Sequence, residues 1–418
     1  MSLTKPQIIF LGVVLLIVIL VVVGIVLRSS STSTDNPATI QTTLNVWTLN
    51  DNANNYSAAI SSFNRIYKGV DVKIKTFTNY DAYKNTIINA MAEGNGPDIF
   101  MIPNDSLQQN INFISPVPPT LYTINDLSNQ FPNVVYQDFV YNNQIYALPV
   151  YIDTLALLYN KNIFNQKGVA LPPQTWNDFQ NTIQQIITKD PDSNQIILPA
   201  AAIGGSSNSI NYATDIFLNI LMQNKLLSPN TDIIKQSLSF YTQFTNAANN
   251  YYTWNDFIGK DFQMFGQEKL AMIFAYAKDL PTIQQQYPLI NIATTNFPQF
   301  DSNNKISLAK YYGYVVSKQS TKKSIAWQFV LQLTTQPKNA NSYISARKLP
   351  PALNYLINQT ANIPNIGIFA KQNLYAKSFP INNQAITSLS DIIAKIISGQ
   401  LDIDKAVNLV KNILNLNN

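Results

Sequence analysis

The segment "VDVKIKTFTNYDAYKNTIINAMAEGNGPDIFMI", residues 70–102, contains three successive patterns that decide the fold class. Apolar and polar residues alternate in "VDVKIKTF", which is typical of a strand with one buried face. Apolar residues then recur at Tyr83, Ile87 and Met91, which predicts a helix that ends near Gly94. The closing "PDIFMI" predicts an apolar strand. A strand, a helix and a buried strand in this order indicate a parallel β–α–β unit.

The preceding residues repeat the same order of patterns. "LNVWTL", residues 44–49, predicts a short strand, and the next segment places Tyr56, Ile60, Phe63 and Tyr67 at helical spacing. The whole region therefore has the order strand, helix, strand, helix, strand. This order predicts an α/β fold with parallel strands and helices that cover both faces of the sheet.

Polar side chains follow the first and the third of these strands. In sheets of this kind ligands bind outside the carboxyl ends of the strands. An aromatic ring together with amides and carboxylates suits a neutral ligand rich in hydroxyl groups. Asn and Asp also cap helices and turns, which is the alternative explanation. The candidates are Trp47, Asn50 and Asp51 after the first strand, and Asn104 and Asp105 after the third.

Helical and strand patterns continue through the rest of the chain. "PPQTWNDFQNTIQQII" opens a helix with a capping-box pattern at Thr175 and Asp178. "IGGSSNS", residues 203–209, indicates a flexible polar loop. We further expect a strand followed by a helix within residues 265–280, a strand over residues 311–318, and amphipathic helices over residues 322–336 and 401–414.

The composition excludes several classes of function. The 418 residues include 13 glycines but no His and no Cys, which removes Ser-His-Asp and Cys-His catalysis, structural zinc sites and iron–sulfur ligation. The phosphate-binding motifs GxGxxG and GxxxxGK[ST] are absent from the sequence. The net charge of +5 is spread along the chain, so a nucleic-acid partner has no support. We expect no catalytic residue, no metal and no cofactor; an enzyme that works through carboxylates alone is the remaining alternative.

The first residues predict a membrane anchor. Ile8–Leu27 contains no charged residue and, at ~1.5 Å per residue, spans the ~30 Å hydrocarbon layer of a bilayer. Arg28 follows directly without a cleavage pattern of small residues, so we expect an uncleaved signal anchor over residues 1–28, with a cleaved signal peptide as the alternative. Residues 29–43, rich in Ser and Thr, would form a tether. The positive-inside rule and the lack of Cys favour an extracytoplasmic body.

One carboxylate lies in a segment that is otherwise apolar. Asp153 interrupts "YALPVYIDTLALLYNKNIF", residues 146–164, and Tyr151 precedes it by two positions. A charged group in a buried strand lowers stability unless it is paired. The segment therefore requires an explanation other than a plain buried strand.

The order of these motifs resembles that of a known protein family. The chain looks like the extracytoplasmic solute-binding proteins of ABC importers, in the branch that includes maltose-binding protein, over most of residues 44–418. The resemblance implies a two-lobe periplasmic-binding-protein-like fold with hinge crossovers, in which lobe 1 comprises residues 44–150 and 309–348 and lobe 2 comprises residues 151–308 and 349–418. It rests on "EGNGPDIFMIPND" (93–105), "YALPVYIDTLALLYNKNIFNQKGVALPPQTWNDF" (146–179), "GQEKLAM" (266–272), "YGYVVSKQSTKKSIAWQFV" (312–330) and "SGQLDIDKAVNLVK" (398–411).

The resemblance also implies which residues bind a ligand between the lobes. "YALPVYIDTLALLYN" would be the first crossing, with Tyr151 exposed and Asp153 in contact with the ligand. Asp105 matches a position that commonly bonds ligand hydroxyls. Further positions implied in the same way are Trp47, Asn50 and Asp51 in the first turn, Tyr276 after the strand of "KLAM", and Tyr311 and Tyr312 before the returning strand.

The function implied by the resemblance is capture of a sugar or oligosaccharide by hinge closure and its delivery to ABC permease subunits. We expect a monomer, anchored by a single pass in the cell membrane, with the folded body outside. Two departures from the family pattern stand out: no lipobox Cys precedes the body, and the usual glycine-rich start of the returning strand is tyrosine-rich. A binding protein for a peptide or polyamine-type solute is one alternative. A surface receptor or adhesion module that is not coupled to transport is another.

Overall fold

The computed structural model describes residues 41–224 and 231–414. The predicted anchor helix, Ile8–Leu27, and most of the tether lie outside the described residues. Within the two described ranges, no helix combines the length and the apolarity needed to cross a bilayer. The described residues divide into two compact units, residues 43–63 with 72–414, which carry every site discussed below, and residues 41–42 with 64–71.

The three patterns of residues 70–102 form the predicted elements, β2 (Val70–Phe77), α3 (Tyr80–Ala92) and β3 (Ile99–Pro103). Helix α3 begins after Asn79, whose side chain accepts a hydrogen bond from the Ala82 amide, and buries its predicted apolar face. Gly94, with a φ of +74°, follows the helix in the left-handed conformation that glycine adopts without a steric penalty. Local sequence therefore accounts for both ends of this helix.

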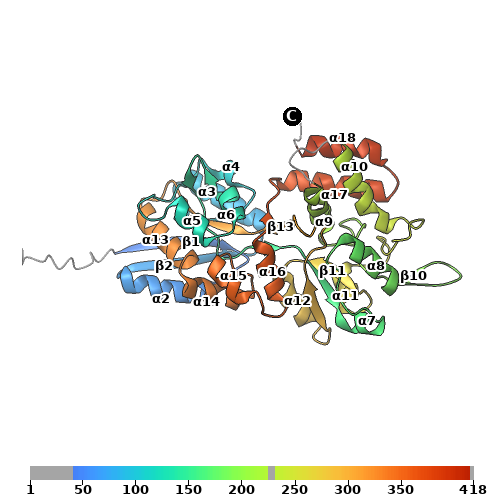
Figure 1. Cartoon of the computed structure of the whole chain (residues 1–418). Helices are drawn as coiled ribbons and strands as arrows, with labels where there is room; N and C mark the ends of the chain where they lie inside the picture. The colour runs from blue at the N-terminus through green and yellow to red at the C-terminus, as the bar shows by residue number, and fades with distance from the viewer. Residues whose placement is uncertain (1–40, 225–230, 415–418) are drawn as a thin grey trace, which may run out of the picture. The chain divides into compact units, whose positions relative to one another are not determined.

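The first sheet is mixed. β1 (Thr42–Leu49) is parallel to β3, with Val46 opposite Ile99. β14 (Tyr312–Ser317) returns from late in the chain and pairs with β3 in the antiparallel sense. The strand order is β2-β1-β3-β14-β4, where β4 is Ile114–Ser115. Figure 1 shows helices α2 (Ser57–Ile66), α13 (Lys323–Thr334) and α14 (Pro337–Arg347) around this sheet.

The second sheet is built on the apolar part of the crossing segment. β8 (Ala156–Asn160) lies between β11 (Met272–Ala275) and β12 (Ile292–Thr295), and both pairings are antiparallel. Residues 155–158 are 0% exposed. They join a large apolar core with α8 (Trp176–Ile186) and α9 (Ala213–Gln223). In Figure 1 the elements of this sheet lie among α8 and the helices α7 (Lys161–Gln166), α11 (Asp261–Gly266) and α12 (Leu280–Gln286).

A small third sheet connects the two. It has the order β15-β13-β7 and consists of β7 (Asp153–Thr154), β13 (Ser307–Lys310) and β15 (Ala376–Lys377). β7 leads into β8 of the second sheet, and β13 leads into β14 of the first sheet. The chain therefore passes between the two larger sheets through paired strands.

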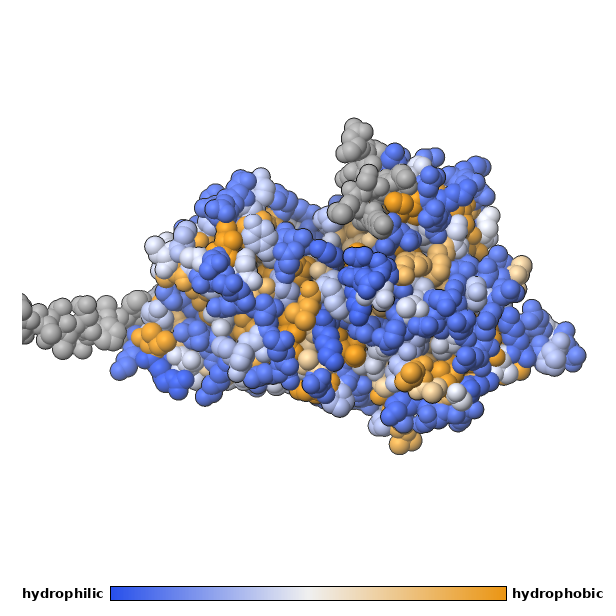
Figure 2. Space-filling view, in the orientation of Figure 1, coloured by the Kyte–Doolittle hydropathy of each residue, from blue (hydrophilic) through white to orange (hydrophobic). Residues whose placement is uncertain are grey.

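The remaining predictions on secondary structure are largely confirmed. The capping box at Thr175 and Asp178 is present at the start of α8. Ile325, Phe329 and Leu333 face the core from α13, and α18 (Ile403–Ile413) buries Val407 and Val410. The face seen in Figure 2 is largely hydrophilic, with scattered apolar patches, which is ordinary for a protein surface. Further elements are α4 (Leu107–Asn110), α5 (Ile124–Gln130), α6 (Asn133–Phe139), β5 (Val140–Tyr141), β6 (Gln144–Ile145), α7 (Lys161–Gln166), β9 (Thr188–Lys189), β10 (Ile196–Leu198), α10 (Thr231–Thr242), α11 (Asp261–Gly266), α12 (Leu280–Gln286), α15 (Asn354–Thr360), α16 (Ile366–Asn373), α17 (Asn383–Ile397) and the 3-10 helices η1 (Ala53–Tyr56), η2 (Gln243–Thr245) and η3 (Ala277–Asp279).

The polar loop at residues 203–209 differs from the expectation of a flexible surface loop. Ser206 and Ser209 are buried, and both hydroxyls donate hydrogen bonds to the carboxylate of Asp256. A Cβ on Gly205 would lie 2.9 Å from the ring of Trp254, so the glycine permits close packing. The small residues that suggested flexibility are required here by the density of the surrounding contacts.

Candidate ligand-binding site

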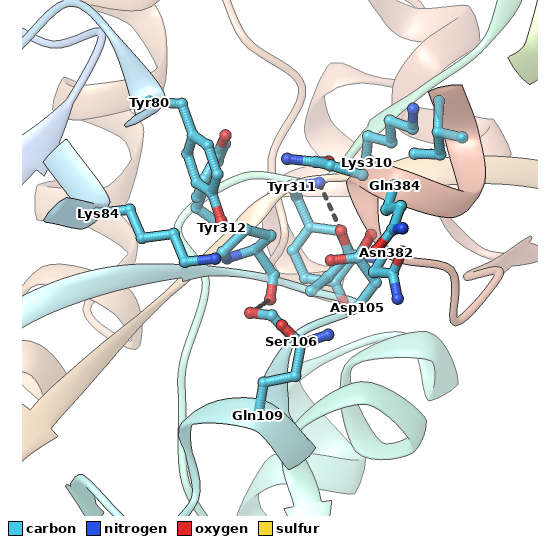
Figure 3. Close-up of a pocket in the computed structure, with 14 residues that line it drawn as sticks. Tyr80, Lys84, Asp105, Ser106, Gln109, Lys310, Tyr311, Tyr312, Asn382 and Gln384 are labelled. Atoms are coloured by element: carbon cyan, nitrogen blue, oxygen red, sulfur yellow. Dashed lines mark hydrogen bonds between the residues drawn. The ribbon is translucent and has the colours of Figure 1, made fainter. Parts of the chain in front are cut away.

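A cavity of about 590 Å³ lies at the carboxyl end of β3, where β13 passes into β14. Its volume is within the range of small-molecule sites, ~300–1,000 Å³. The wall combines hydroxyl, amide and charged groups with aromatic rings, so it can meet a ligand rich in hydrogen-bonding groups. The wall includes Tyr80 and Lys84 of α3, Asp105 after β3, Tyr312 of β14, and Asn382 and Gln384 at the start of α17 (Figure 3).

Asp105 contributes a carboxylate whose acceptor capacity is largely unused. Its side chain is half-buried, and within residues 41–224 and 231–414 no side chain donates a hydrogen bond to it. Burial raises the pKa of Asp105, while the ammonium group of Lys310 acts in the opposite direction. An ionised carboxylate accepts strong hydrogen bonds from hydroxyl donors. Asp105 therefore stays a candidate for contact with a ligand hydroxyl.

Lys310 brings a positive charge to the same cavity and is held there by an ion pair. Its Nζ lies 2.6 Å from Oδ1 of Asp215, a residue of α9. The hydroxyl of Tyr276 donates to Oδ2 of Asp215 at 3.0 Å. Tyr276 is 1% exposed and is not part of the cavity wall. In this arrangement Tyr276 supports the Asp215–Lys310 pair, and contact of its ring with ligand stays a prediction.

Asn104 and Tyr311 line the cavity, but their polar groups bond to one another and to Asp138. The Tyr311 amide donates to Oδ1 of Asn104 at 3.1 Å, and the Tyr311 hydroxyl donates to Oδ2 of Asp138 at 2.5 Å. Ser378 Oγ accepts from Asn104 at 2.6 Å and donates to Asp138 at 2.6 Å. Burial raises the pKa of Asp138 to about 6, against the effect of these donors. This network joins four distant segments of the chain and fixes the shape of the wall.

Asn50, Asp51 and Tyr151 lie in a separate cluster around Arg347. The side chain of Asp51 is 0% exposed, and its Oδ2 accepts the hydroxyl of Tyr343 and lies 3.4 Å from Nη1 of Arg347. Nη2 of Arg347 donates to the Asn50 carbonyl at 2.8 Å. The guanidinium carbon lies 5.6 Å from the ring centre of Tyr151. Tyr151 is only 8% exposed, so the expectation that it is exposed is wrong: its ring packs in this cluster. These residues are not part of the wall of the 590 Å³ cavity, and their contact with ligand stays a prediction.

Asp153 is satisfied within the protein. It is 1% exposed; Oδ1 accepts from the amides of Thr154 at 3.0 Å and Ala277 at 2.9 Å, and Oδ2 accepts from the amide of Lys278 at 3.0 Å. Burial raises the pKa of Asp153 to about 7, although these amides oppose the rise. The carboxylate therefore holds the start of η3 against β7, which explains a charge in an apolar segment. Its contact with ligand stays a prediction.

Trp47 lies inside β1, because the strand continues to Leu49 and does not end at the tryptophan. Its ring centre is 4.3 Å from Nζ of Lys75 and 5.6 Å from the ring of Phe77. Both partners belong to β2. The ring thus packs between neighbouring strands and is not part of the cavity wall.

Of the ten candidate residues, the structure brings four into one cavity, Asn104, Asp105, Tyr311 and Tyr312. Sequence reasoning missed several residues beside them. Tyr80 and Lys84 start a helix that follows a strand, which is a signal that could have been used. Lys310 directly precedes the two tyrosines that were chosen. Asn382 and Gln384 carry no such signal, because only tertiary structure brings the start of α17 to this place.

Comparison with known proteins decides the family. The sequence pattern of the family described as "Bacterial extracellular solute-binding protein" matches residues 58–364. The chain belongs to this family. Membership confirms the resemblance drawn from the sequence, and it places the folded body of this solute-binding protein outside the cytoplasm. Because the members bind substrates and are not enzymes, membership also confirms that the chain is not an enzyme.

Two relatives with assigned functions match parts of this solute-binding protein. The "Multiple sugar-binding protein" of Streptococcus mutans is 24% identical over 226 residues, which are 51% of this chain and 51% of that protein. The "Maltotriose-binding protein" of Pyrococcus abyssi is 26% identical over 134 residues, which are 32% of this chain and 28% of that protein. The chain therefore spans about half the length of the first relative and less of the second.

Solved structures share the fold over nearly the whole chain. The sugar-binding protein MalE from Xanthomonas citri aligns with a TM-score of 0.74 at 16% identity, covering 90% of this chain and 97% of that one. The cyclic α-maltosyl-1,6-maltose binding protein from Arthrobacter globiformis aligns with a TM-score of 0.72 at 15% identity, covering 89% and 98%. The predicted two-lobe α/β fold is confirmed by these likenesses.

Proposed function

We propose that this solute-binding protein captures a sugar or oligosaccharide and delivers it to the permease of an ABC importer. Three relatives support the ligand class by their names, "Multiple sugar-binding protein", "Maltotriose-binding protein" and "Galactooligosaccharide-binding protein". A cyclo/maltodextrin-binding protein of the same fold, with a TM-score of 0.71 at 18% identity, was solved with maltotetraose. Delivery to a permease follows from the family resemblance.

The observation that carries the proposal is the Asp105 carboxylate, to which no side chain of the described residues donates a hydrogen bond, in a cavity lined by Tyr80, Tyr311 and Tyr312. Apolar faces of sugar rings pack on aromatic side chains, while carboxylates and amides satisfy hydroxyls that would otherwise be buried without partners. Tyr80 and Tyr312 provide the rings, and Gln384 provides an amide. We assign ligand contact first to Asp105 and Tyr312, with Asn104 and Tyr311 as the residues that fix their surroundings.

Capture would work through closure of the two lobes about the sheet β15-β13-β7. In our proposal the lobes are residues 44–150 with 309–348, and residues 151–308 with 349–418. A ligand shifts an open–closed equilibrium only by its differential affinity for the two states. A sugar that contacts both α3 and the start of α17, which line opposite sides of the cavity in Figure 3, would favour the closed state.

The proposal also includes membrane tethering by the apolar segment Ile8–Leu27. Tethering keeps the binding protein close to its permease, which raises the effective concentration of one for the other. Protease treatment of intact cells, followed by mass analysis of the amino-terminal fragment that remains with the membrane, tests this part. Recovery of a mature protein that begins after residue 28 would support a cleaved signal instead.

Thermal unfolding of the full-length chain against a ligand panel tests the ligand class. We expect stabilisation by at least one sugar or oligosaccharide and none by peptides or polyamines. Asp105→Ala should reduce the shift, whereas the matched surface variant Asp192→Ala should retain it. A response confined to peptides or polyamines would contradict the sugar assignment. Normal sugar uptake by cells that lack the gene would contradict the transport role and favour a receptor.

A further inference from the structure

A second cavity of about 390 Å³ adjoins the first and has the opposite chemistry. Its floor is made of buried apolar side chains, including Ile87 and Met91 of α3 and Phe100 of β3. Its rim carries Ile88 and Phe113, each 54% exposed. Single exposed apolar residues are ordinary, but two that lie beside a concave apolar floor suit an apolar ligand group, although the lining also carries the polar residues Lys84, Gln109 and Gln319. We call this cavity the apolar groove.

The two cavities share part of their walls. Tyr80, Lys84, Pro103 and Gln109 line both. Tyr80 and Lys84 are four residues apart on α3, so they lie on the same face of the helix. Each has an apolar body and a polar tip, which suits a boundary between an apolar and a polar space. Figure 3 shows Tyr80, Lys84 and Gln109 on one side of the polar cavity, with Asn382 and Gln384 on the other.

The size of the apolar groove fits a small-molecule substituent. Its 390 Å³ equals the space of about a dozen water molecules at ~30 Å³ each. The apolar floor offers no side-chain hydrogen bonds to such water, because the polar tips of the lining belong to Tyr, Lys, Gln and Asn residues around it. Displacing poorly ordered water with an apolar group increases affinity. A ring system or a short alkyl chain that enters from the polar cavity would therefore be bound favourably.

We infer that the ligand is a glycoside whose sugar occupies the polar cavity and whose apolar aglycone, an aryl or short alkyl group, occupies the apolar groove. This inference rests on the proposed function, because it uses the sugar site as one half of a continuous site. The shared wall is what selects this occupant, because a ligand that contacts Tyr80 and Lys84 borders both cavities at once.

The test compares ligands that differ only in the aglycone, with the full-length chain. The probes are methyl and 2-naphthyl β-maltoside, methyl and 2-naphthyl β-glucoside, and 2-naphthol alone, each titrated by calorimetry or by naphthyl fluorescence. Ile88→Asn and Ile88→Trp alter the groove from its exposed rim, the first by adding a polar group and the second by filling it. Ile197→Asn is the matched control, because Ile197 is 63% exposed and lies on β10, outside both cavities.

For whichever sugar binds, we expect the affinity of its naphthyl glycoside to be at least about tenfold above that of its methyl glycoside. Burying ~60 Å² of apolar surface produces a gain of this size. The gain should persist in Ile197→Asn and fall below about twofold in both Ile88 variants. The methyl glycoside should bind equally to all four proteins. Loss of methyl glycoside binding in the Ile88 variants would mean a general disturbance of the site and would overturn the inference.

The remaining outcomes separate this inference from the proposed function. Methyl glycoside binding without a naphthyl gain would overturn the groove assignment and leave the sugar site intact. In a further outcome, 2-naphthol binds, both Ile88 variants abolish its binding, and no methyl glycoside binds. This result would support the groove and contradict the sugar assignment. Dimerisation that Ile88→Asn abolishes, with no naphthyl gain, would assign the groove to a second copy of the chain and overturn the inference. Failure of every probe would overturn both.

Discussion

The sequence suggests both Asp105 and Asp153 as ligand-binding residues, but their carboxylates lie in opposite environments. Asp153 is 1% exposed, and its two oxygens accept hydrogen bonds from the amides of Thr154, Ala277 and Lys278. Asp105 is half-buried in the wall of a cavity, and no side chain in the described parts of the chain donates to it. The residue type is the same, but three backbone amides already bond to Asp153, whereas Asp105 borders a cavity.

This difference shows what identifies a binding carboxylate. An acidic residue in an apolar segment is conspicuous in a sequence, but internal N–H donors can explain it completely. A carboxylate at the carboxyl end of a buried strand is less conspicuous, because Asp is common in turns. Unused acceptors beside a cavity are therefore better evidence for ligand contact than an unusual position in the sequence. Variants of these residues test this difference, and the largest effect is expected for Asp153.

Replacing Asp153 should mainly affect stability. In Asp153→Ala the buried amide of Ala277 and the partly buried amide of Lys278 lose their acceptor, at about 1–3 kcal/mol for each unsatisfied group. We expect the free energy of unfolding, measured with urea, to fall by about 2–4 kcal/mol, while Asp192→Ala leaves it unchanged. The sugar affinity of the folded protein should stay within about twofold. Lost affinity with unchanged stability would place Asp153 in the ligand site and contradict the difference between its role and that of Asp105.

Replacing Asp105 should produce the opposite pair of effects. Hydrogen bonds to charged groups contribute about 1.5–3 kcal/mol, so Asp105→Ala should weaken sugar binding by about 10- to 150-fold in calorimetry. The free energy of unfolding should change by less than about 0.5 kcal/mol, because no hydrogen bond from another side chain is lost. Unchanged affinity would remove Asp105 from the site.

Stability should decrease as the pH rises from 5 to 8. Burial raises the pKa of Asp153 to about 7 and that of Asp138 to about 6, both above the ordinary value of 3.8. The folded state therefore holds these protons more tightly than the unfolded state, and the stabilisation is lost as the pH rises through 6 and 7, by on the order of 1 kcal/mol per pKa unit.

The variant Asp138→Asn tests how much Asp138 contributes to this pH dependence. The amide keeps one oxygen as an acceptor for Tyr311 and Ser378 and removes the titration. Urea unfolding at several pH values should show a smaller decrease between pH 5 and 8 in the variant than in the natural chain. An identical pH dependence in the two proteins would mean that Asp138 has its ordinary pKa in the folded state.

The smallest effect is expected at Tyr312. Packing of a sugar face on an aromatic ring contributes about 0.5–1.5 kcal/mol, so Tyr312→Ala should weaken binding by about two- to tenfold. Tyr312→Phe keeps the ring and should bind almost as the natural chain does. Equal losses in the two variants would show that the hydroxyl, and not the ring, contacts the ligand.

Much of the fold follows from local sequence. Three features could be predicted because each depends on neighbours within a few residues: the alternation in β2, the apolar spacing of α3 and the capping box of α8. The lobe architecture came from the family resemblance. The buried loop at residues 203–209 could not be predicted, because its packing depends on Asp256 and Trp254, which only the tertiary structure brings close.

The site was predictable only in part, for the same physical reason. Asp105 and Tyr312 were found because the carboxyl end of a strand and the start of the returning strand are recognisable. The pairing of Asp153 with η3 was not, because the amides that satisfy it belong to Ala277 and Lys278, far along the chain. The contribution of the start of α17 to the cavity likewise depends on how the segments pack.

The crystal structure of the full-length chain with the sugar that binds tightest in the panel tests the central claim most directly. We predict a sugar hydroxyl within hydrogen-bonding distance of the Asp105 carboxylate, a sugar face against Tyr312 or Tyr80, and Asp153 still bonded to the amides of Ala277 and Lys278. A sugar bonded to Asp153, or bound away from the cavity at the end of β3, would contradict the account.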